Sequence, residues 1–222
     1  GMRAVTKLKQ SKTAKNVSNS GLVSSTQQGV HPRLEACVRR HLATSWAQPL
    51  HRPTLEAWRQ LELQDVFASG RAVVLDSGCG TGESTRRLAL MYPRHLVIGV
   101  DRSLKRLGKS GVTSGILHND NLLLVRAELA TFWRLLLNSG RHPERHFLFY
   151  PNPWPKPGHL SRRWHGHPVF PEFLTLGGEI EMRCNWEVYA QEFAQAAGIA
   201  TAQGIKVMKI QPDKGISPFE QK

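Results

Sequence analysis

Short apolar runs alternate with longer mixed segments from about residue 70 to residue 210. The runs are rich in Val, Ile, Leu and Phe, as buried strands are, and they comprise Ala72–Leu75, Leu96–Val100, Leu122–Val125, Phe147–Tyr150, Glu179–Cys184 and Ile205–Ile210. Helical character marks the segments between them, which are 83–91, 102–110, 128–138 and 186–197. Alternation of this kind predicts βαβ units, and therefore an α/β fold with a doubly wound, mostly parallel sheet.

The chain before residue 70 follows a different pattern. Residues 1–30 are mostly Ser, Thr, Gln, Asn and Lys, with no acidic residue before Glu35. Such a composition buries little apolar surface and predicts a disordered basic tail, or alternatively an arm that contacts RNA phosphates. Residues 31–69 carry Leu, Val and Trp at helical spacing, which predicts a helical cover at one edge of the sheet. We expect a single domain over 31–222.

Charge narrows the range of partners. The 222 residues include 30 Lys and Arg against 17 Asp and Glu, a formal net charge of +13. This excess favours a polyanionic partner, either nucleic acid or an anionic membrane surface. No apolar run is long enough to span a membrane. The three cysteines form no paired pattern, which favours a reducing, cytoplasmic location.

Two pairs of histidines are the candidates for a metal site. His142 and His146 lie four residues apart, and His165 and His167 lie two apart. Neither pair has a cysteine or an acidic cluster beside it, so we expect no metal.

A glycine-rich loop follows the first run. Residues 73–84 read V-V-L-D-S-G-C-G-T-G-E-S, so an acidic residue ends the strand and three glycines lead into a helix. A second acid, Asp101, follows the next strand about twenty residues later, where a ribose-binding carboxylate belongs. An acid beside the loop suits a cationic ligand better than the phosphate that a helix N-terminus usually binds. We expect Cys79 to pack rather than to act as a nucleophile, because no base is placed beside it by sequence.

This loop resembles motif I of class I S-adenosylmethionine-dependent methyltransferases, which have a Rossmann-like fold. The resemblance implies that Gly78, Gly80 and Gly82 hold the methionine part of the cofactor. By position, Asp76 resembles the acid near the amino group and Asp101 the acid that binds the ribose. Glu128, after the third strand, is the candidate contact for adenine.

The segment after the fourth run, F-L-F-Y-P-N-P-W-P-K-P-G-H-L-S-R-R, carries a second set of candidates. Ligands of open α/β sheets bind at the carboxyl ends of strands, so Asn152 belongs at the methyl-bearing side of the cofactor. The indole of Trp154 can stack on a base. Lys156, Arg162 and Arg163 supply positive charge for an RNA backbone.

The same segment strongly resembles the F-P-D-P-W-x-K signature, with its following basic run, of the tRNA (guanine-N7)-methyltransferase family. Residues 177–189, G-G-E-I-E-M-R-C-N-W-E-V-Y, resemble the family's G-G-x-x-x-x-x-T-D-W-x-x-Y. Ser217, Phe219 and Glu220 resemble its T-x-F-E, which contacts cofactor and guanine. The resemblance covers roughly residues 70–220. It implies methyl transfer from S-adenosylmethionine to N7 of guanine in tRNA.

Two positions depart from the family. Asn152 and Asn185 stand where it has aspartates. A carboxylate accepts both N1–H and N2–H of guanine, whereas an amide has only one acceptor oxygen, and losing one such contact costs about 1–3 kcal/mol of base discrimination. Two alternatives therefore stay open: methylation of an amine, because Asn152-Pro153-Trp154 faintly resembles the N-P-P-[Y/F/W] loop of amine methyltransferases, or a non-catalytic RNA-binding relative.

The implied mechanism is a direct displacement. Guanine N7 carries a free lone pair and needs no general base, so catalysis consists of alignment and exclusion of water, with Asn152 and Asn185 orienting the base. The expected partners are tRNA or another structured RNA and no membrane, for a monomer or homodimer. The chain stops just after Glu220, where relatives continue into a last strand, so we expect a sheet that lacks this strand or closes differently.

Overall fold

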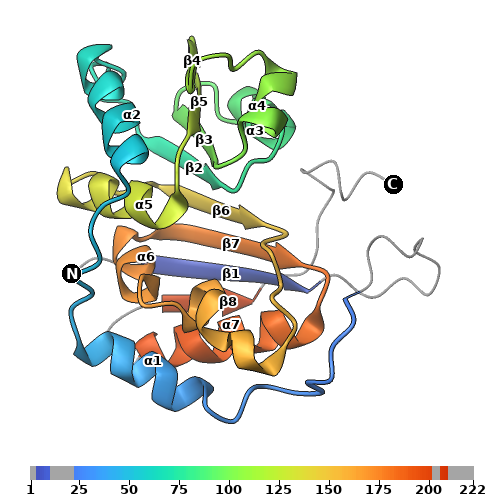
Figure 1. Cartoon of the computed structure of the whole chain (residues 1–222). Helices are drawn as coiled ribbons and strands as arrows, with labels where there is room; N and C mark the ends of the chain where they lie inside the picture. The colour runs from blue at the N-terminus through green and yellow to red at the C-terminus, as the bar shows by residue number, and fades with distance from the viewer. Residues whose placement is uncertain (1–3, 11–22, 202–205, 210–222) are drawn as a thin grey trace. The chain divides into compact units, whose positions relative to one another are not determined.

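The structure, a computed structural model, describes residues 4–10, 23–201 and 206–209. These residues form two compact units, one drawn from Gly1–Ala47 and Tyr150–Pro212 and the other from Gln48–Phe149. Figure 1 labels their helices and strands. No helix in the described ranges is both long and apolar enough to cross a membrane.

The second unit is built on a five-stranded sheet in the order β4-β5-β3-β2-β6. Its strands are β2 (Val73–Ser77), β3 (Leu96–Asp101), β4 (Ile116–Asn119), β5 (Leu122–Arg126) and β6 (Arg145–Phe149). All neighbours pair in parallel except the β4–β5 hairpin. Strand order reverses at β2, because β3 and β6 lie on its two sides, and ligands of doubly wound sheets bind at such a point.

Helices cover both faces of this sheet. They are α2 (Arg52–Leu63), α3 (Glu83–Met91), α4 (Leu104–Leu107) with the 3₁₀ turn η2 (Gly108–Ser110), and α5 (Leu129–Asn138). α2 and α5 lie on one side of the strands, and α3 and α4 lie on the other (Figure 1). β2 and β3 are buried along their whole length, as strands covered on both faces are.

The first unit holds three parallel strands, with β1 (Ala4–Gln10) between β7 (Gly178–Cys184) and β8 (Lys206–Lys209). Its helices are α1 (Leu34–Ala43), α6 (Phe170–Leu176) and α7 (Glu187–Thr201), with the 3₁₀ turns η3 (Pro157–Arg162) and η4 (Trp164–Gly166). α7 packs on the strands, and α1 packs on α7 and α6. The core of this unit includes Phe170, Phe173 and Phe193, whose rings contact one another.

All six predicted strands and all four predicted helical segments are present, which confirms the α/β class with a mostly parallel sheet. The structure adds two strands. Ala4–Gln10, expected within a disordered tail, pairs with two strands at once, so that its backbone groups are satisfied without a strongly apolar sequence. Ile116–Asn119 is short and forms a hairpin through Asp120 (φ 52°) and Asn121.

Candidate functional site

The glycine loop leaves β2 and turns into α3 as the sequence predicts. Gly78, Gly80 and Gly82 have φ angles of 75°, 59° and 84°, which side-chain-bearing residues rarely adopt. The backbone N–H groups of Gly78 and Cys79 both donate to Val100 O, at 2.8 and 3.0 Å, and fix the loop on the end of β3. A Cβ added at Gly80 would meet no atom nearer than 3.8 Å, whereas one at Gly82 would lie 3.0 Å from Leu124. The open part of the loop backbone is therefore at Gly78 and Gly80.

Asp76 is fully buried beneath this loop. Its Oδ2 accepts hydrogen bonds from Ser84 Oγ at 2.7 Å and Thr85 Oγ1 at 2.8 Å, both on α3. Its Oδ1 is buried with no hydrogen-bond partner in the described part of the chain. Burial raises the pKa of this carboxyl group to about 6, against the two hydroxyl hydrogen bonds. A held carboxylate with one oxygen to spare fits a cationic N–H donor.

Cys79 lies between the glycines and is buried. Burial raises the pKa of its thiol well above the usual value, so the sulfur stays protonated near neutral pH. This agrees with the packing role expected for it.

Asp101 contacts the glycine loop directly. Its Oδ2 accepts from Gly80 N at 2.9 Å, and its Oδ1 accepts from Ser103 N at 2.8 Å. The structure therefore brings together the loop and the acid that the sequence assigned to one ligand. It also adds a residue that we did not predict, because Arg106 Nη2 donates to Asp101 Oδ1 at 3.0 Å. The sequence D-R-S-L-K-R, in which Ser103 caps α4, is the signal that could have indicated the Asp101–Arg106 pair.

Glu128 precedes α5 at its N-cap position. Its backbone N–H donates to Thr54 Oγ1 at 2.8 Å, and its Oε1 accepts from Thr131 Oγ1 at 3.1 Å. The Glu128 carboxylate thus bonds a side chain in the first turn of α5. A contact with adenine remains a prediction.

A buried polar group lies behind the loop and was not predicted. Ser77 Oγ accepts from Trp133 Nε1 at 2.9 Å and lies 2.7 Å from His146 Nε2. Burial lowers the pKa of His146 to about 3, so this imidazole is neutral near neutral pH. Among the described residues, no three His, Cys, Asp or Glu side chains cluster as metal ligands would.

Asn152 and Asn185 each follow a segment of the first unit, and a backbone hydrogen bond joins these two segments. Tyr150 N donates to Arg183 O at 2.7 Å, and each asparagine lies two residues beyond this bond, Asn152 on one segment and Asn185 on the other. Asn152 is exposed, and its Oδ1 accepts from Trp154 N at 3.2 Å. Tyr150 and Trp154 have positive φ angles of 50° and 43°. Backbone strain of this kind is held in place by surrounding structure and concentrates at functional sites.

The predicted RNA-binding cations divide into two kinds. Lys156 and Arg162 are exposed, and the Arg162 guanidinium lies 5.0 Å from the centre of the Trp154 ring. Arg163 is fully buried and forms an ion pair with Glu192 at 2.8 Å. The expectation that Arg163 contacts RNA is therefore wrong, because its buried guanidinium already donates to acceptors within the protein. Ser217 and Glu220 lie outside the described residues.

Comparison with known proteins gives one family and a set of curated relatives. The family model described as "Putative methyltransferase" matches residues 70–214. A tRNA (guanine-N(7)-)-methyltransferase of Streptomyces coelicolor is 28% identical over 151 residues, which cover 65% of this chain and 54% of the relative. One from Neisseria meningitidis serogroup C is 28% identical over 138 residues, covering 61% and 58%. One from Stutzerimonas stutzeri is 26% identical over 172 residues, covering 72% and 71%. The chain spans little more than half the length of the first two.

Proposed function

We propose, given that this chain belongs to the methyltransferase family whose model matches residues 70–214, that it methylates N7 of guanine in tRNA with S-adenosylmethionine as methyl donor. The observation that carries the proposal is the loop at the end of β2. There, Asp76 keeps one buried carboxylate oxygen without a partner, and Asp101 binds the backbone of the same loop. The names of the curated relatives support the choice of guanine N7 and tRNA.

The residues present fit S-adenosylmethionine. The free Oδ1 of Asp76 can accept an N–H from the cofactor's ammonium group, and ionised Asp76 offsets its charge. Asp101 has the chemistry to accept the two ribose hydroxyls once Arg106 releases it. The open backbone of Gly78 and Gly80 admits the methionine part. Glu128 stays the proposed contact for adenine.

S-adenosylmethionine supplies an electrophilic methyl group on a sulfonium sulfur. The lone pair of guanine N7 forms the new C–N bond as the methyl–sulfur bond breaks, and no proton is lost from N7. The protein therefore has to align the base and exclude water rather than remove a proton. We assign the alignment to Asn152 and Asn185, whose amide oxygens can each accept an N–H of guanine.

RNA binding is assigned to the exposed cations. Arg162 lies over the partly exposed ring of Trp154, and Lys156 is exposed two residues further along the chain. A base can then stack on the indole while the charges contact phosphates. Ser217 and Glu220 stay proposed contacts for the cofactor and the guanine.

The test is methylation of tRNA from a strain that lacks N7-methylguanine. Purified protein is incubated with this tRNA and methyl-labelled S-adenosylmethionine, and the digested nucleosides are identified by mass spectrometry. We expect label in N7-methylguanosine and none after the Asp101→Ala change. Label on an exocyclic amine would move the activity to amine methylation. Absence of label, together with absent binding of S-adenosylhomocysteine by calorimetry, would overturn the methyltransferase assignment.

A further inference from the structure

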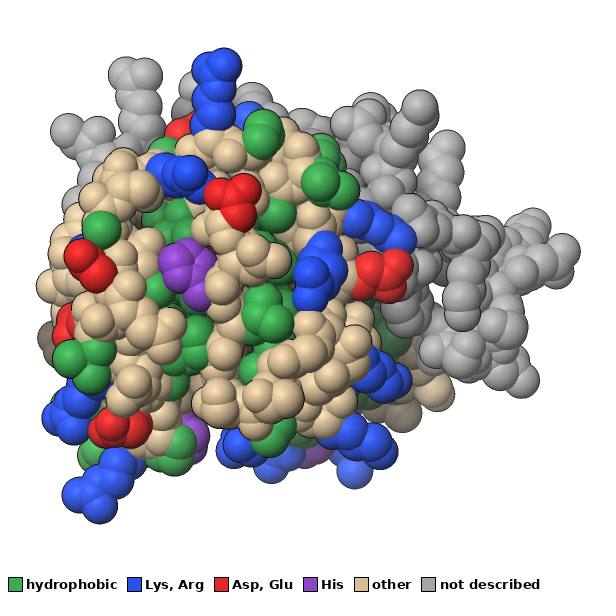
Figure 2. Space-filling view, turned by 90° about the horizontal axis from the view of Figure 1, so that it is seen from above, with side chains coloured by type: hydrophobic (Ala, Val, Ile, Leu, Met, Phe, Trp, Pro, Cys, Tyr) green, Lys and Arg blue, Asp and Glu red, His purple; other side chains and the backbone are tan. Residues whose placement is uncertain are grey.

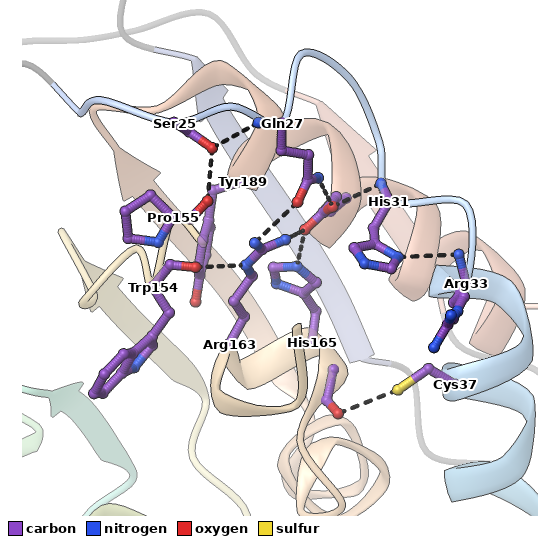
Figure 3. Close-up of polar contacts among 12 residues, drawn as sticks. Ser25, Gln27, His31, Arg33, Cys37, Trp154, Pro155, Arg163, His165 and Tyr189 are labelled. Carbon is purple, nitrogen blue, oxygen red and sulfur yellow. Dashed lines mark hydrogen bonds and ion pairs between the residues drawn. The ribbon is translucent and has the colours of Figure 1, made fainter. Parts of the chain in front are cut away.

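A buried arginine holds the loop that carries Asn152 and Trp154. Arg163 has no exposed surface, and its guanidinium donates four hydrogen bonds. Figure 3 draws those to Trp154 and Gln27. Nε donates to Trp154 O at 3.0 Å, and Nη2 donates to Lys156 O at 3.1 Å. The other two bonds run from Nη1 to Glu192 Oε1 at 2.8 Å and from Nη2 to Gln27 Oε1 at 3.0 Å. One side chain thus joins the loop, α7 and the segment before α1.

Glu192 balances the charge of this arginine within the core. Its Oε1 accepts from Arg163 and from His165 Nε2, the latter at 2.8 Å. Its Oε2 accepts from Gln27 Nε2 at 2.7 Å and from His31 N at 2.8 Å. Its four acceptor positions are filled, and its pKa falls to about 2 because these hydrogen bonds and charges outweigh burial. Burial lowers the pKa of His165. Arg163 and Glu192 form a pair of opposite charges.

The segment Ser25–His31 completes the arrangement. Ser25 Oγ donates to Pro155 O at 2.6 Å. The amide of Gln27 bridges the buried pair, since it accepts from Arg163 and donates to Glu192. Figure 3 shows Gln27 bonded to the Arg163 guanidinium and Ser25 bonded to Pro155.

Three successive carbonyl groups of the loop are therefore bound from outside it. Trp154 O and Lys156 O accept from Arg163, and Pro155 O accepts from Ser25. The loop reads P-N-P-W-P. Proline has no backbone N–H, so the three prolines leave the loop few donors for hydrogen bonds of its own. Its strained conformation at Trp154 needs support from surrounding structure.

We propose that Ser25, through its bond to Pro155 O, and Gln27, through the Arg163–Glu192 pair, are positioning residues for the substrate-binding loop. Residues 25–31 lie outside the range that the family model matches, so this support belongs to a part of the chain that the family assignment leaves aside. Without it, the loop samples conformations in which Asn152 is not aligned with the base. The consequence for catalysis rests on the proposed function, whereas the consequence for loop order does not.

Two matched pairs of variants test the proposal. Ser25→Ala removes the hydroxyl bonded to Pro155 O, and Ser24→Ala makes the same change at an exposed neighbour. Gln27→Met keeps the length of the side chain and removes both bridging hydrogen bonds, and Gln28→Met is its exposed control. Each variant is compared with the wild-type protein in two assays.

Hydrogen exchange of peptides covering residues 150–162, read by mass spectrometry, reports loop order without any need for activity. We expect about tenfold faster exchange there in the Ser25 and Gln27 variants and wild-type rates in both controls. Steady-state methylation of tRNA reports the effect on catalysis. We expect kcat to fall about tenfold or more, with KM for tRNA and the affinity for S-adenosylhomocysteine within about twofold of wild type.

Unchanged exchange over 150–162 in both variants would overturn the proposal. So would faster exchange with an unchanged kcat, because the support would then be structural alone. A uniform rise of exchange across the protein would also contradict it, since that pattern reports global destabilisation. If the wild-type protein does not methylate RNA, the proposed function fails, and the exchange comparison still decides whether these residues order the loop.

Discussion

Replacing Arg106 with alanine removes one of the two donors bonded to Asp101 Oδ1, and we expect it to tighten binding of S-adenosylhomocysteine. In the structure, Arg106 Nη2 lies 3.0 Å from Asp101 Oδ1. A ribose hydroxyl that binds this oxygen must replace the guanidinium. After the change, Asp101 still accepts from Gly80 N and Ser103 N, so the carboxylate remains held in place.

The size of the effect follows from the exposure of the pair. The Arg106 side chain is 56% exposed and the Asp101 side chain 3%. An ion pair with one solvated partner contributes about 0.2–1 kcal/mol. Removing this competing contact therefore corresponds to roughly a 1.4-fold to fivefold lower Kd. High salt screens the exposed partner, so the gain shrinks as ionic strength rises.

Isothermal titration calorimetry with S-adenosylhomocysteine at low and at high salt measures this difference. Lys105→Ala is the matched control, because it removes the same charge from an exposed neighbour in α4. We expect the control to bind as the wild type does. An Arg106→Ala protein that binds more weakly than wild type would refute the reasoning, since Arg106 would then help to hold the ligand.

Further outcomes follow from other features of the structure. Burial raises the pKa of Asp76 to about 6, so calorimetric affinity for S-adenosylhomocysteine should rise about tenfold from pH 5 to pH 7, and Asp76→Asn should abolish this dependence. The same shift means that the contribution of Asp76 to the free energy of unfolding is present below its unfolded pKa of 3.8 and is lost as pH rises through about 6. Lys156→Ala and Arg162→Ala should each weaken tRNA binding and lower its salt slope by about one, measured by filter binding, and an unchanged slope would remove that residue from the interface. A Cβ at Gly99 would clash with Thr85 Oγ1 of α3, so Gly99→Ala should cost about 1–3 kcal/mol in urea unfolding, whereas Gly108→Ala, where the space is open, should be near neutral.

The order of elements could be read from the chain because it depends on local pattern. β-rich apolar runs bounded by polar turns form strands wherever both faces become covered, and β2, β3, β5, β6, β7 and β8 all lie at predicted runs. The glycine loop could also be predicted from the sequence. Three glycines in positive φ and the two acids are fixed by their distance along the chain from β2 and β3.

The local sequence pattern did not predict a strand that is stabilised by pairing with strands far away in the sequence. β1 lies in a polar, lysine-rich segment, and its pairing with β7 and β8 joins residues more than 160 positions apart. Side-chain composition carries little information about such pairing, because the backbone supplies the hydrogen bonds.

The sequence by itself determined the α/β class, the family signature and the candidate cofactor acids Asp76 and Asp101, because each depends on spacing along one short segment. Only the tertiary structure decided which of the basic side chains are exposed and which are buried. Arg162 and Arg163 are neighbours of the same type, yet Arg162 is exposed and Arg163 is buried against Glu192. The difference arises from a carboxylate 29 residues away and an amide 136 residues away, which together replace the water that a guanidinium loses on burial.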